Sequence, residues 1–140
     1  MYKIERRFTL PIGHRLSKHK GRCFSFHGHN FVVLVGVKAE LLNENDMVMD
    51  FSDLNAVVEG FLDQFDHCTM LNVVDSEIAE QLKELGTRVI LVEHDPTAEK
   101  LSEIIYKSIE ETLEKMYPNV IIDYVTVYEN EKSKATYSED

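Results

Sequence analysis

The chain has 140 residues, of which 44% are hydrophobic, and this size and composition fit one domain over residues 1–140. Its net charge of −10 at pH 7 argues against a nucleic-acid-binding protein, because such proteins need a basic surface to displace phosphate counterions. No apolar run approaches the roughly 18 residues of a membrane span, and no apolar signal core follows Met1. We therefore expect a cytoplasmic protein whose partners include neither nucleic acid nor membrane.

Two strands are predicted in the first third of the chain, where β-branched and aromatic residues concentrate. They cover residues 2–10 and 31–37, and the 20 residues between them are predicted to form a basic loop. A turn is predicted at 43–46, and Ser52 is a candidate N-cap for the helix that follows. The apolar residues of that helix recur at steps of three and four: Leu54, Val57, Val58, Phe61, Leu62 and Phe65.

Two further helices are predicted in the second half of the chain. A short helix over 76–85 is ended by Gly86, and a short strand follows at 88–93. The longest helix begins after Asp95-Pro96-Thr97, carries an apolar stripe at helical spacing, and stops before Pro118.

The last two predicted strands cover residues 120–129 and 134–137. The order of elements indicates an α+β fold, in which an antiparallel sheet of about four long strands is covered on one face by helices. Because such a sheet leaves its edges open, we expect it to continue across subunits.

Positive charge concentrates at the N-terminal end, although the chain as a whole is acidic. Residues 1–38 hold eight Lys or Arg and one acid, so the remainder carries seven basic against 24 acidic side chains. Four of the six histidines lie in the same segment. This segment suits a site for a metal ion and an anionic small molecule, and a solvated basic face is the plainer alternative. With only Cys23 and Cys68, a disulfide is not expected.

Three histidines are candidate ligands for one metal ion. His27 and His29 stand two residues apart and lead into a predicted strand, so their imidazoles project from the same side, and Gly28 leaves the approach uncrowded. His14, across the loop, can complete a three-histidine site with a fourth position open for water or substrate. Three imidazoles suit Zn²⁺ best, although cobalt, nickel or copper would also fit.

Four other residues are candidates for proton transfer or ligand binding. Cys23 is a fourth metal ligand, a buried apolar residue, or a thiolate base activated by nearby positive charge. Asp66 directly precedes His67, and a carboxylate beside an imidazole can orient it and raise its basicity. Glu129 ends an otherwise apolar strand, where it is either a solvated strand end or an acid that faces a pocket.

Seven short motifs occur in an order that is typical of one enzyme family, and they cover nearly the whole chain. On these motifs the chain resembles the 6-pyruvoyltetrahydropterin synthase family, which includes the animal pterin synthase and the bacterial 6-carboxytetrahydropterin synthase of queuosine biosynthesis. The motifs are His14-Arg15-Leu16, Cys23-x3-His27-Gly28-His29-Asn30, Val48-Met49-Asp50-Phe51, Asp66-His67-x3-Leu71-Asn72, Pro96-Thr97-x-Glu99, Val127-Tyr128-Glu129 and Ala135-x-Tyr137.

The resemblance implies the tunnelling fold, in which each subunit contributes a four-stranded antiparallel sheet with two helices. The sheets of several subunits join into a barrel, commonly in a dimer of trimers. The family's roles comprise three zinc ligands, a proton-abstracting thiolate, a relay pair from a neighbouring subunit and a carboxylate that anchors the pterin. By this resemblance His14, His27 and His29 are the zinc ligands, and Cys23 is the thiolate. Asp66 with His67 is the relay pair, and Glu129 is the carboxylate that anchors the pterin.

The implied substrate is 7,8-dihydroneopterin triphosphate, which would explain the positive N-terminal segment of an acidic protein. Two reactions share this site. The pyruvoyl reaction eliminates triphosphate and moves protons along the side chain, whereas the carboxy reaction also cleaves the side chain, releasing acetaldehyde and leaving a carboxylate on the ring. The three-residue gap between Cys23 and His27 resembles the bacterial enzyme and favours the carboxy reaction. A non-catalytic metal- or pterin-binding subunit is the third alternative.

The chain departs from the family pattern in three places. Leu10-Pro11-Ile12-Gly13 replaces the usual aromatic-x-Ala-x approach to the first ligand, and Asn130 replaces the Thr that usually follows the anchoring Glu. The segment from Val73 to Asp95 is longer than in many relatives, and either oligomer contacts or substrate gating would account for it.

Overall fold

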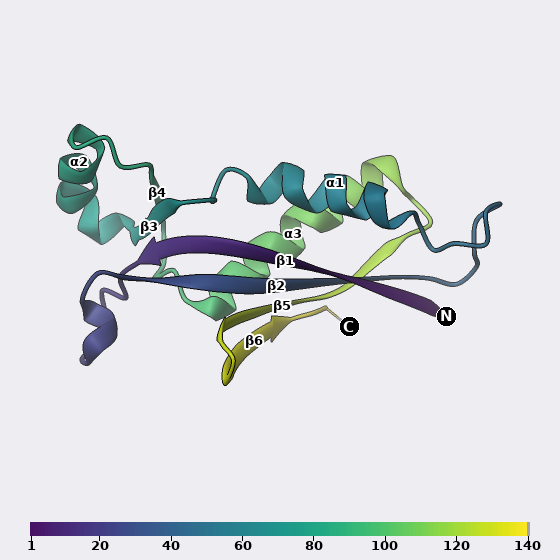
Figure 1. The fold of residues 1–140 in the computed structure, drawn as a ribbon, viewed down its shortest axis with the longest axis horizontal. Helices are drawn as coiled ribbons and strands as arrows, with labels where there is room; N and C mark the ends of the chain where they lie inside the picture. Colours follow the sequence, from purple (N-terminus) through teal and green to yellow (C-terminus); the bar gives the residue numbers. More distant parts are fainter. Residues whose placement is uncertain (140) are drawn as a thin grey trace.

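A six-stranded sheet forms the body of the protein in a computed structural model, which describes residues 1–139 (Figure 1). Four strands pair antiparallel in the order β1-β2-β5-β6, and two short strands extend the sheet beyond β1 through parallel pairing, so the full order is β4-β3-β1-β2-β5-β6. The strands are β1 (Tyr2–His14), β2 (His27–Ala39), β3 (Cys68–Asn72), β4 (Val89–Val92), β5 (Ile121–Asn130) and β6 (Ser133–Tyr137).

The α+β class and the four long antiparallel strands agree with the prediction, and the parallel extension of the sheet by β3 and β4 adds to it. The strand β3 was not predicted, because it has only five residues and no polar–apolar alternation. Its pairing with β1, in which Ile12 stands opposite Cys68, joins segments that are far apart in sequence. The strand β4 lies within the range predicted for it.

The predicted loop between the first two strands is shorter than expected. The strands β1 and β2 both continue past the apolar stretches that predicted them, so that Leu10 pairs with Phe31 and His14 pairs with His27. The residues from 11 to 14 and from 27 to 30 are therefore extended strand, since cross-strand hydrogen bonding outweighs their poor strand propensity. Both histidine segments consequently lie on a rigid sheet.

The helices occupy the predicted places, with one correction at the first of them. Asp50, and not Ser52, is the N-cap: its carboxylate accepts a hydrogen bond from the backbone N–H of Ser52 at 2.8 Å, and Ser52 lies inside the first turn. The same helix ends three residues before Phe65. The helices are α1 (Phe51–Leu62), α2 (Ser76–Glu84) and α3 (Ala98–Met116), with 3₁₀ turns η1 (Arg22–Phe24) and η2 (Val73–Asp75).

The core lies between the sheet and the two longer helices. Figure 1 shows α1 and α3 along one side of the sheet, while α2 lies at the end of the molecule where β3 and β4 extend it. Alternate residues of β1 and β2 point into this core, and the apolar stripe of α3 packs against β5 and β6. Among residues 1–139, no helix combines the length and apolar character needed to cross a membrane.

Candidate metal centre and active site

The three candidate histidines extend the core-facing rows of β1 and β2. On β1, Ile12 is buried in the core, and the next residue on the same face is His14. On β2, the residues that precede buried Phe31 on its face are His29 and His27. Because His14 and His27 are paired across the two strands, all three imidazoles meet at one end of the sheet.

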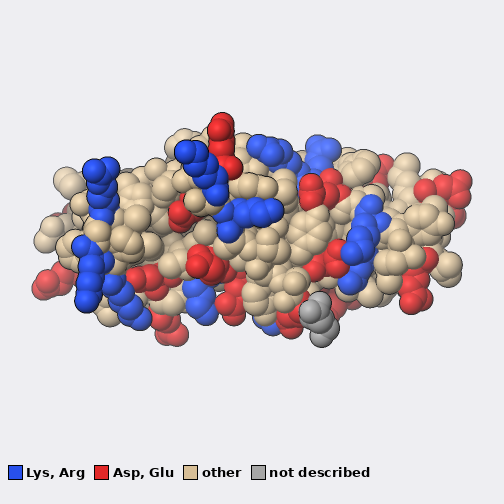
Figure 2. Space-filling model, turned by 90° about the horizontal axis from the view of Figure 1, so that it is seen from below, with Lys and Arg blue, Asp and Glu red and all other residues tan. Residues whose placement is uncertain are grey.

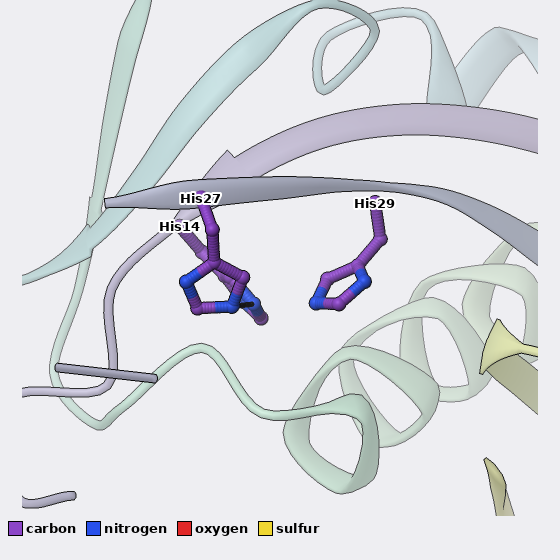
Figure 3. Close-up of side chains that lie close together, drawn as sticks. All are labelled: His14, His27 and His29. Carbon is purple, nitrogen blue, oxygen red and sulfur yellow. Dashed lines mark hydrogen bonds between the residues drawn. The ribbon is translucent and has the colours of Figure 1, made fainter. Parts of the chain in front are cut away.

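The ring nitrogens of these histidines are close enough to hold one metal ion. One nitrogen from each lies within 4.8 Å of the other two, and the Nε2 atoms of His14 and His27 are 2.9 Å apart. Nitrogen ligands of one tetrahedral zinc stand about 3.4 Å apart. Figure 3 shows the rings projecting from the strands toward the segment that begins α3. The prediction that His14, His27 and His29 lie together is therefore confirmed geometrically.

The hydrogen bonds of the other ring nitrogens show that a cation suits this site. The Nδ1 of His14 is 2.8 Å from the carbonyl oxygen of Pro96, and the Nδ1 of His27 is 2.8 Å from the carbonyl oxygen of Ser25. A carbonyl only accepts, so in neutral rings both Nδ1 atoms carry the proton and both Nε2 atoms present lone pairs to each other. A metal ion between them removes that repulsion, and carbonyl partners of this kind orient metal-binding imidazoles.

The protonation state of His14 also fits a metal ligand. Burial lowers the pKa of His14 to about 4; the hydrogen bond to Pro96 opposes this shift, whereas His27 and His29 add to it. The side chain is 1% exposed. The imidazole of His14 is therefore neutral at pH 7, as ligation requires.

The predicted thiol lies on the loop that joins the ligand-bearing strands. Cys23 sits in η1 and is half-buried, which argues against a purely structural core cysteine. Its Sγ is not part of the three-histidine group. Its backbone carbonyl accepts a hydrogen bond from Leu16 N at 2.9 Å, and the next residue, Phe24, packs under the Arg15 guanidinium at 3.9 Å. The loop around Cys23 is thus held by contacts with Arg15 and Leu16, the two residues that follow His14.

Glu129 lies near the end of β5, beside the start of α3. It is half-buried and lines a pocket of about 410 Å³ together with Ala98, Glu99 and residues 133–136. Because Ala98 follows closely on Pro96, whose carbonyl contacts His14, the pocket and the histidine cluster adjoin the same helix start. This position is compatible with one of the two predicted alternatives, an acid that faces a pocket.

Asp66 and His67 contact each other but do not join the histidine cluster of their own chain. The Asp66 carboxylate accepts from His67 Nδ1 at 2.6 Å, which is the predicted arrangement of the pair. The His67 side chain is 82% exposed, and its backbone is left-handed with φ of 59°. Such a conformation is uncommon outside glycine, and strained backbone of this kind tends to occur at functional sites.

Basic side chains surround the loop at the same end of the molecule. Lys18, Lys20 and Arg22 are exposed in it. Figure 2 shows several Lys and Arg side chains at the end of the molecule where this loop lies, while side chains of both signs are spread over the rest of that face. The positive segment seen in the sequence is therefore a local surface beside the histidine site.

Sequence reasoning missed two neighbours of the site. Pro96 belongs to a quoted motif, but its contribution is a backbone carbonyl, for which the sequence carries no signal beyond a helix start. Asp75 lies 8% exposed at the end of η2, and its carboxylate is 3.8 Å from Arg15 Nε. Both contacts depend on tertiary structure.

Comparisons with known proteins agree with these observations. A family model described as 6-pyruvoyl tetrahydropterin synthase matches residues 3–140. The chain is 29% identical to a 6-carboxy-5,6,7,8-tetrahydropterin synthase of Aquifex aeolicus over 99% of both chains. It is 33% identical to the protein of that name from Rickettsia bellii, over 73% of this chain and 75% of the other. The Haemophilus influenzae protein of the same name is 32% identical over 79% and 83%.

Solved structures share the fold. An uncharacterized protein from Wolinella succinogenes superposes with a TM-score of 0.85 at 19% identity, covering 99% of this chain and 98% of that one. The Caenorhabditis elegans 6-pyruvoyl tetrahydropterin synthase superposes with a TM-score of 0.73 at 23% identity, covering 99% and 96%. The subunit architecture of the tunnelling fold implied by the motifs is therefore confirmed.

Proposed function

The chain belongs to the 6-pyruvoyl tetrahydropterin synthase family, and from this premise we propose that it is a zinc-dependent 6-carboxytetrahydropterin synthase. It would convert 7,8-dihydroneopterin triphosphate to 6-carboxy-5,6,7,8-tetrahydropterin, with release of acetaldehyde and triphosphate. The observation that carries this proposal is the three-histidine cluster with two facing Nε2 atoms, in a chain whose named relatives are 6-carboxytetrahydropterin synthases.

Two observations favour the carboxy reaction over the pyruvoyl reaction. Relatives at 29–33% identity carry the carboxy name. The three-residue gap between Cys23 and His27 also resembles the bacterial enzyme. The pyruvoyl reaction is the second candidate, and its support is the description of the family as a whole.

His14, His27 and His29 would hold the zinc ion. When bound, zinc supplies Lewis-acid chemistry, because it lowers the pKa of hydroxyl groups that coordinate it. The protein's own part is to orient the ligands: the Pro96 and Ser25 carbonyls accept the Nδ1 protons of His14 and His27 and leave both Nε2 atoms free.

Cys23 would be the base that removes a proton from the substrate side chain. Its place outside the histidine group supports a base rather than a fourth ligand. Asp66 would hold His67 through the 2.6 Å hydrogen bond, so that the imidazole can pass protons to or from the reacting carbon. Because His67 is 82% exposed and turned to solvent, the pair would serve the site of a neighbouring subunit.

Glu129 would anchor the pterin ring. A carboxylate in the pocket beside α3 can accept paired hydrogen bonds from the ring's amino group and N–H. The exposed Lys18, Lys20 and Arg22 would attract the triphosphate to the same end of the molecule.

A homo-oligomer, with the active sites at subunit interfaces, would complete this arrangement. The edge strands β4 and β6 have no outer partner among the described residues, so both are open to pairing with a second copy of the chain. A dimer of trimers would close such sheets into a barrel and bring Asp66 and His67 of one copy toward the histidines of another.

Triphosphate release tests whether the protein acts on this substrate at all. The zinc-loaded protein, incubated with 7,8-dihydroneopterin triphosphate, should release triphosphate, and Cys23→Ala with the same zinc content should not. A folded, zinc-loaded protein that releases no triphosphate, or a Cys23→Ala variant that releases it equally fast, would contradict the proposal.

A further inference from the structure

One carboxylate outside the candidate site gathers hydrogen bonds from three segments. Asp95 Oδ1 accepts from Ser17 Oγ at 2.5 Å and from Asn72 Nδ2 at 3.0 Å, and its Oδ2 accepts from the backbone N–H of Lys18 at 3.0 Å. Asp95 is half-buried, whereas Asn72 is 3% exposed at the end of β3. The carboxylate therefore joins the loop after His14 to the sheet.

Two of these donors belong to the loop that carries Cys23. Ser17 and Lys18 are the central residues of a short turn, in which His19 N donates to the Leu16 carbonyl at 3.0 Å, and Leu16 N donates to the Cys23 carbonyl at 2.9 Å. One backbone hydrogen bond thus separates the part of the loop held by Asp95 from Cys23 itself. The position of Cys23 depends on whether this turn stays against Asp95.

The next residue along the chain connects Asp95 to the histidine cluster. Pro96 is buried, and its carbonyl accepts from His14 Nδ1 at 2.8 Å. A residue that precedes proline has a restricted backbone, and the proline ring fixes its own φ, so the main chain from Asp95 to that carbonyl has few conformations. An Asp95 side chain fixed on Ser17 and Lys18 also fixes the partner of His14.

We propose that Asp95 is a positioning residue, which holds the Cys23 loop and the carbonyl partner of His14 in one arrangement. It acts through Ser17 and Lys18 on one side and through Pro96 on the other. This role gives a function to the far end of the long segment from Val73 to Asp95. The inference rests on the proposed function only where turnover is measured, because metal binding and thiol exposure can be measured without substrate.

The chemistry of the partners requires a carboxylate at this position. All three partners donate, and only an ionised carboxylate accepts at both oxygens. Burial works to raise the pKa of Asp95, but the hydrogen bonds from Ser17, Lys18 and Asn72 outweigh it and lower the pKa below its usual value. In Asp95→Asn the amide NH₂ would face one of the donors, so one hydrogen bond would be lost with almost no change in shape.

Two measurements in Asp95→Asn test the proposal, with Asp123→Asn as the matched control. Asp123 is also a partly buried carboxylate of lowered pKa, paired with Lys3 and Lys38 at 2.9 Å each. Lys3 and His14 lie 11 residues apart on β1, which places the control on the order of 35 Å from the site. The measurements are zinc affinity, by competition with a chelator, and the rate of alkylation of the zinc-free protein by iodoacetamide.

The second cysteine does not disturb the alkylation measurement. Cys68 is 2% exposed, and burial raises the pKa of its thiol to about 11, so Cys23 is the thiol that reacts near neutral pH. In Asp95→Asn we expect the zinc affinity to fall about tenfold or more, as when other outer partners of metal ligands are removed. We expect alkylation to speed up about fivefold, which is the effect of one lost hydrogen bond on loop opening.

Turnover provides a third readout in the zinc-saturated variant. A displaced Cys23 should lower kcat while KM changes little, because Asp95 does not touch the substrate site. A purely structural role would instead lower thermal stability and leave both zinc affinity and alkylation unchanged in the folded protein. A wild-type protein without turnover would contradict the proposed function but would leave the other two readouts of Asp95 valid.

Two results would overturn the proposal. One is an Asp95→Asn protein with the zinc affinity and alkylation rate of the wild type, and the other is an equal loss in Asp123→Asn. If Asp95→Asn does not fold, Ser17→Ala removes one donor and leaves the carboxylate in place. Ser17→Ala should then show smaller changes in the same directions, and unchanged values of both quantities would overturn the proposal equally.

Discussion

His14 and His27 face each other through their Nε2 atoms at 2.9 Å, while the Nδ1 of each lies 2.8 Å from a backbone carbonyl. Neutral rings held in this way have no proton to place between the two Nε2 atoms. Because His14 and His27 are paired across β1 and β2, the register of the two strands brings their imidazole rings together. The site is therefore preorganised for a cation by the register of two strands.

Removal of single ligands should empty the site without unfolding the protein. We expect about one zinc per chain in the wild type, and a loss of most of it in His27→Ala and His29→Ala, because two imidazoles rarely hold catalytic zinc. Among residues 1–139 His14 is the only buried histidine, and His27 and His29 lie outside the core, so circular dichroism should stay close to that of the wild type. Elemental analysis that finds full zinc in His29→Ala would rule out the assignment of His29 as a ligand.

The Cys23→Ala variant distinguishes two possible roles of Cys23, a metal ligand and a general base. We expect normal zinc content and a loss of turnover of at least about a hundredfold, the usual contribution of a general base. Zinc content and kcat are measured on the same preparation. If the zinc were lost as completely as in the histidine variants, Cys23 would be a ligand and another residue would be the base.

The exposed Asp66–His67 pair can be tested by mixing subunits. Cys23→Ala and His67→Ala are each expected to be inactive, but subunits unfolded together and reassembled at equal amounts should regain activity. If Cys23 and His67 of one site come from different subunits, about a quarter of the sites in random oligomers have both residues intact. Activity that stays at the level of the separate variants would contradict a shared site.

Glu129→Gln should weaken binding of the pterin ring and not of the phosphates. The amide presents a donor to a donor of the ring, so affinity should fall at least about tenfold while zinc content stays normal. Affinity for an unphosphorylated pterin such as biopterin should fall as much as affinity for the triphosphate, as calorimetry can measure. Undiminished biopterin binding would make Glu129 a solvated strand end.

An ion-paired carboxylate far from the site should contribute to stability only above acid pH. Lys3 and Lys38 stand opposite each other on β1 and β2, and Asp123 contacts both at 2.9 Å. Burial works to raise the pKa of Asp123, but the two lysines outweigh it and lower the pKa. Since the folded-state pKa lies below the unfolded one, this stabilisation is complete above about pH 4 and is lost as pH falls through the folded-state pKa.

Urea unfolding of Asp123→Asn at two pH values tests this direction of the pH dependence of stability. The variant should be less stable than the wild type by about 1 kcal/mol at pH 7, the size of a partly exposed ion pair. The difference should be smaller at pH 2.5, because the wild-type carboxyl loses its charge as pH falls through its lowered pKa. A difference that stays the same at both pH values would show that the charge of Asp123 contributes nothing.

Local patterns predicted those parts of the fold and site that local chemistry determines. The helix α3 follows from its apolar stripe and from Thr97, whose side chain accepts from Lys100 N, and the histidine cluster follows from strand alternation. The strand β3 and the hydrogen bonds of Asp95 were not predictable in the same way. They join residues up to 78 positions apart, and no short-range spacing encodes such contacts.

The identity of the product is the most direct test of whether the protein catalyses the carboxy reaction. Zinc-loaded protein is incubated with 7,8-dihydroneopterin triphosphate, and the mass of the pterin product and the amount of acetaldehyde are measured together. We expect 6-carboxytetrahydropterin and one equivalent of acetaldehyde per triphosphate released. A 6-pyruvoyl product without acetaldehyde would contradict the assignment of the carboxy reaction.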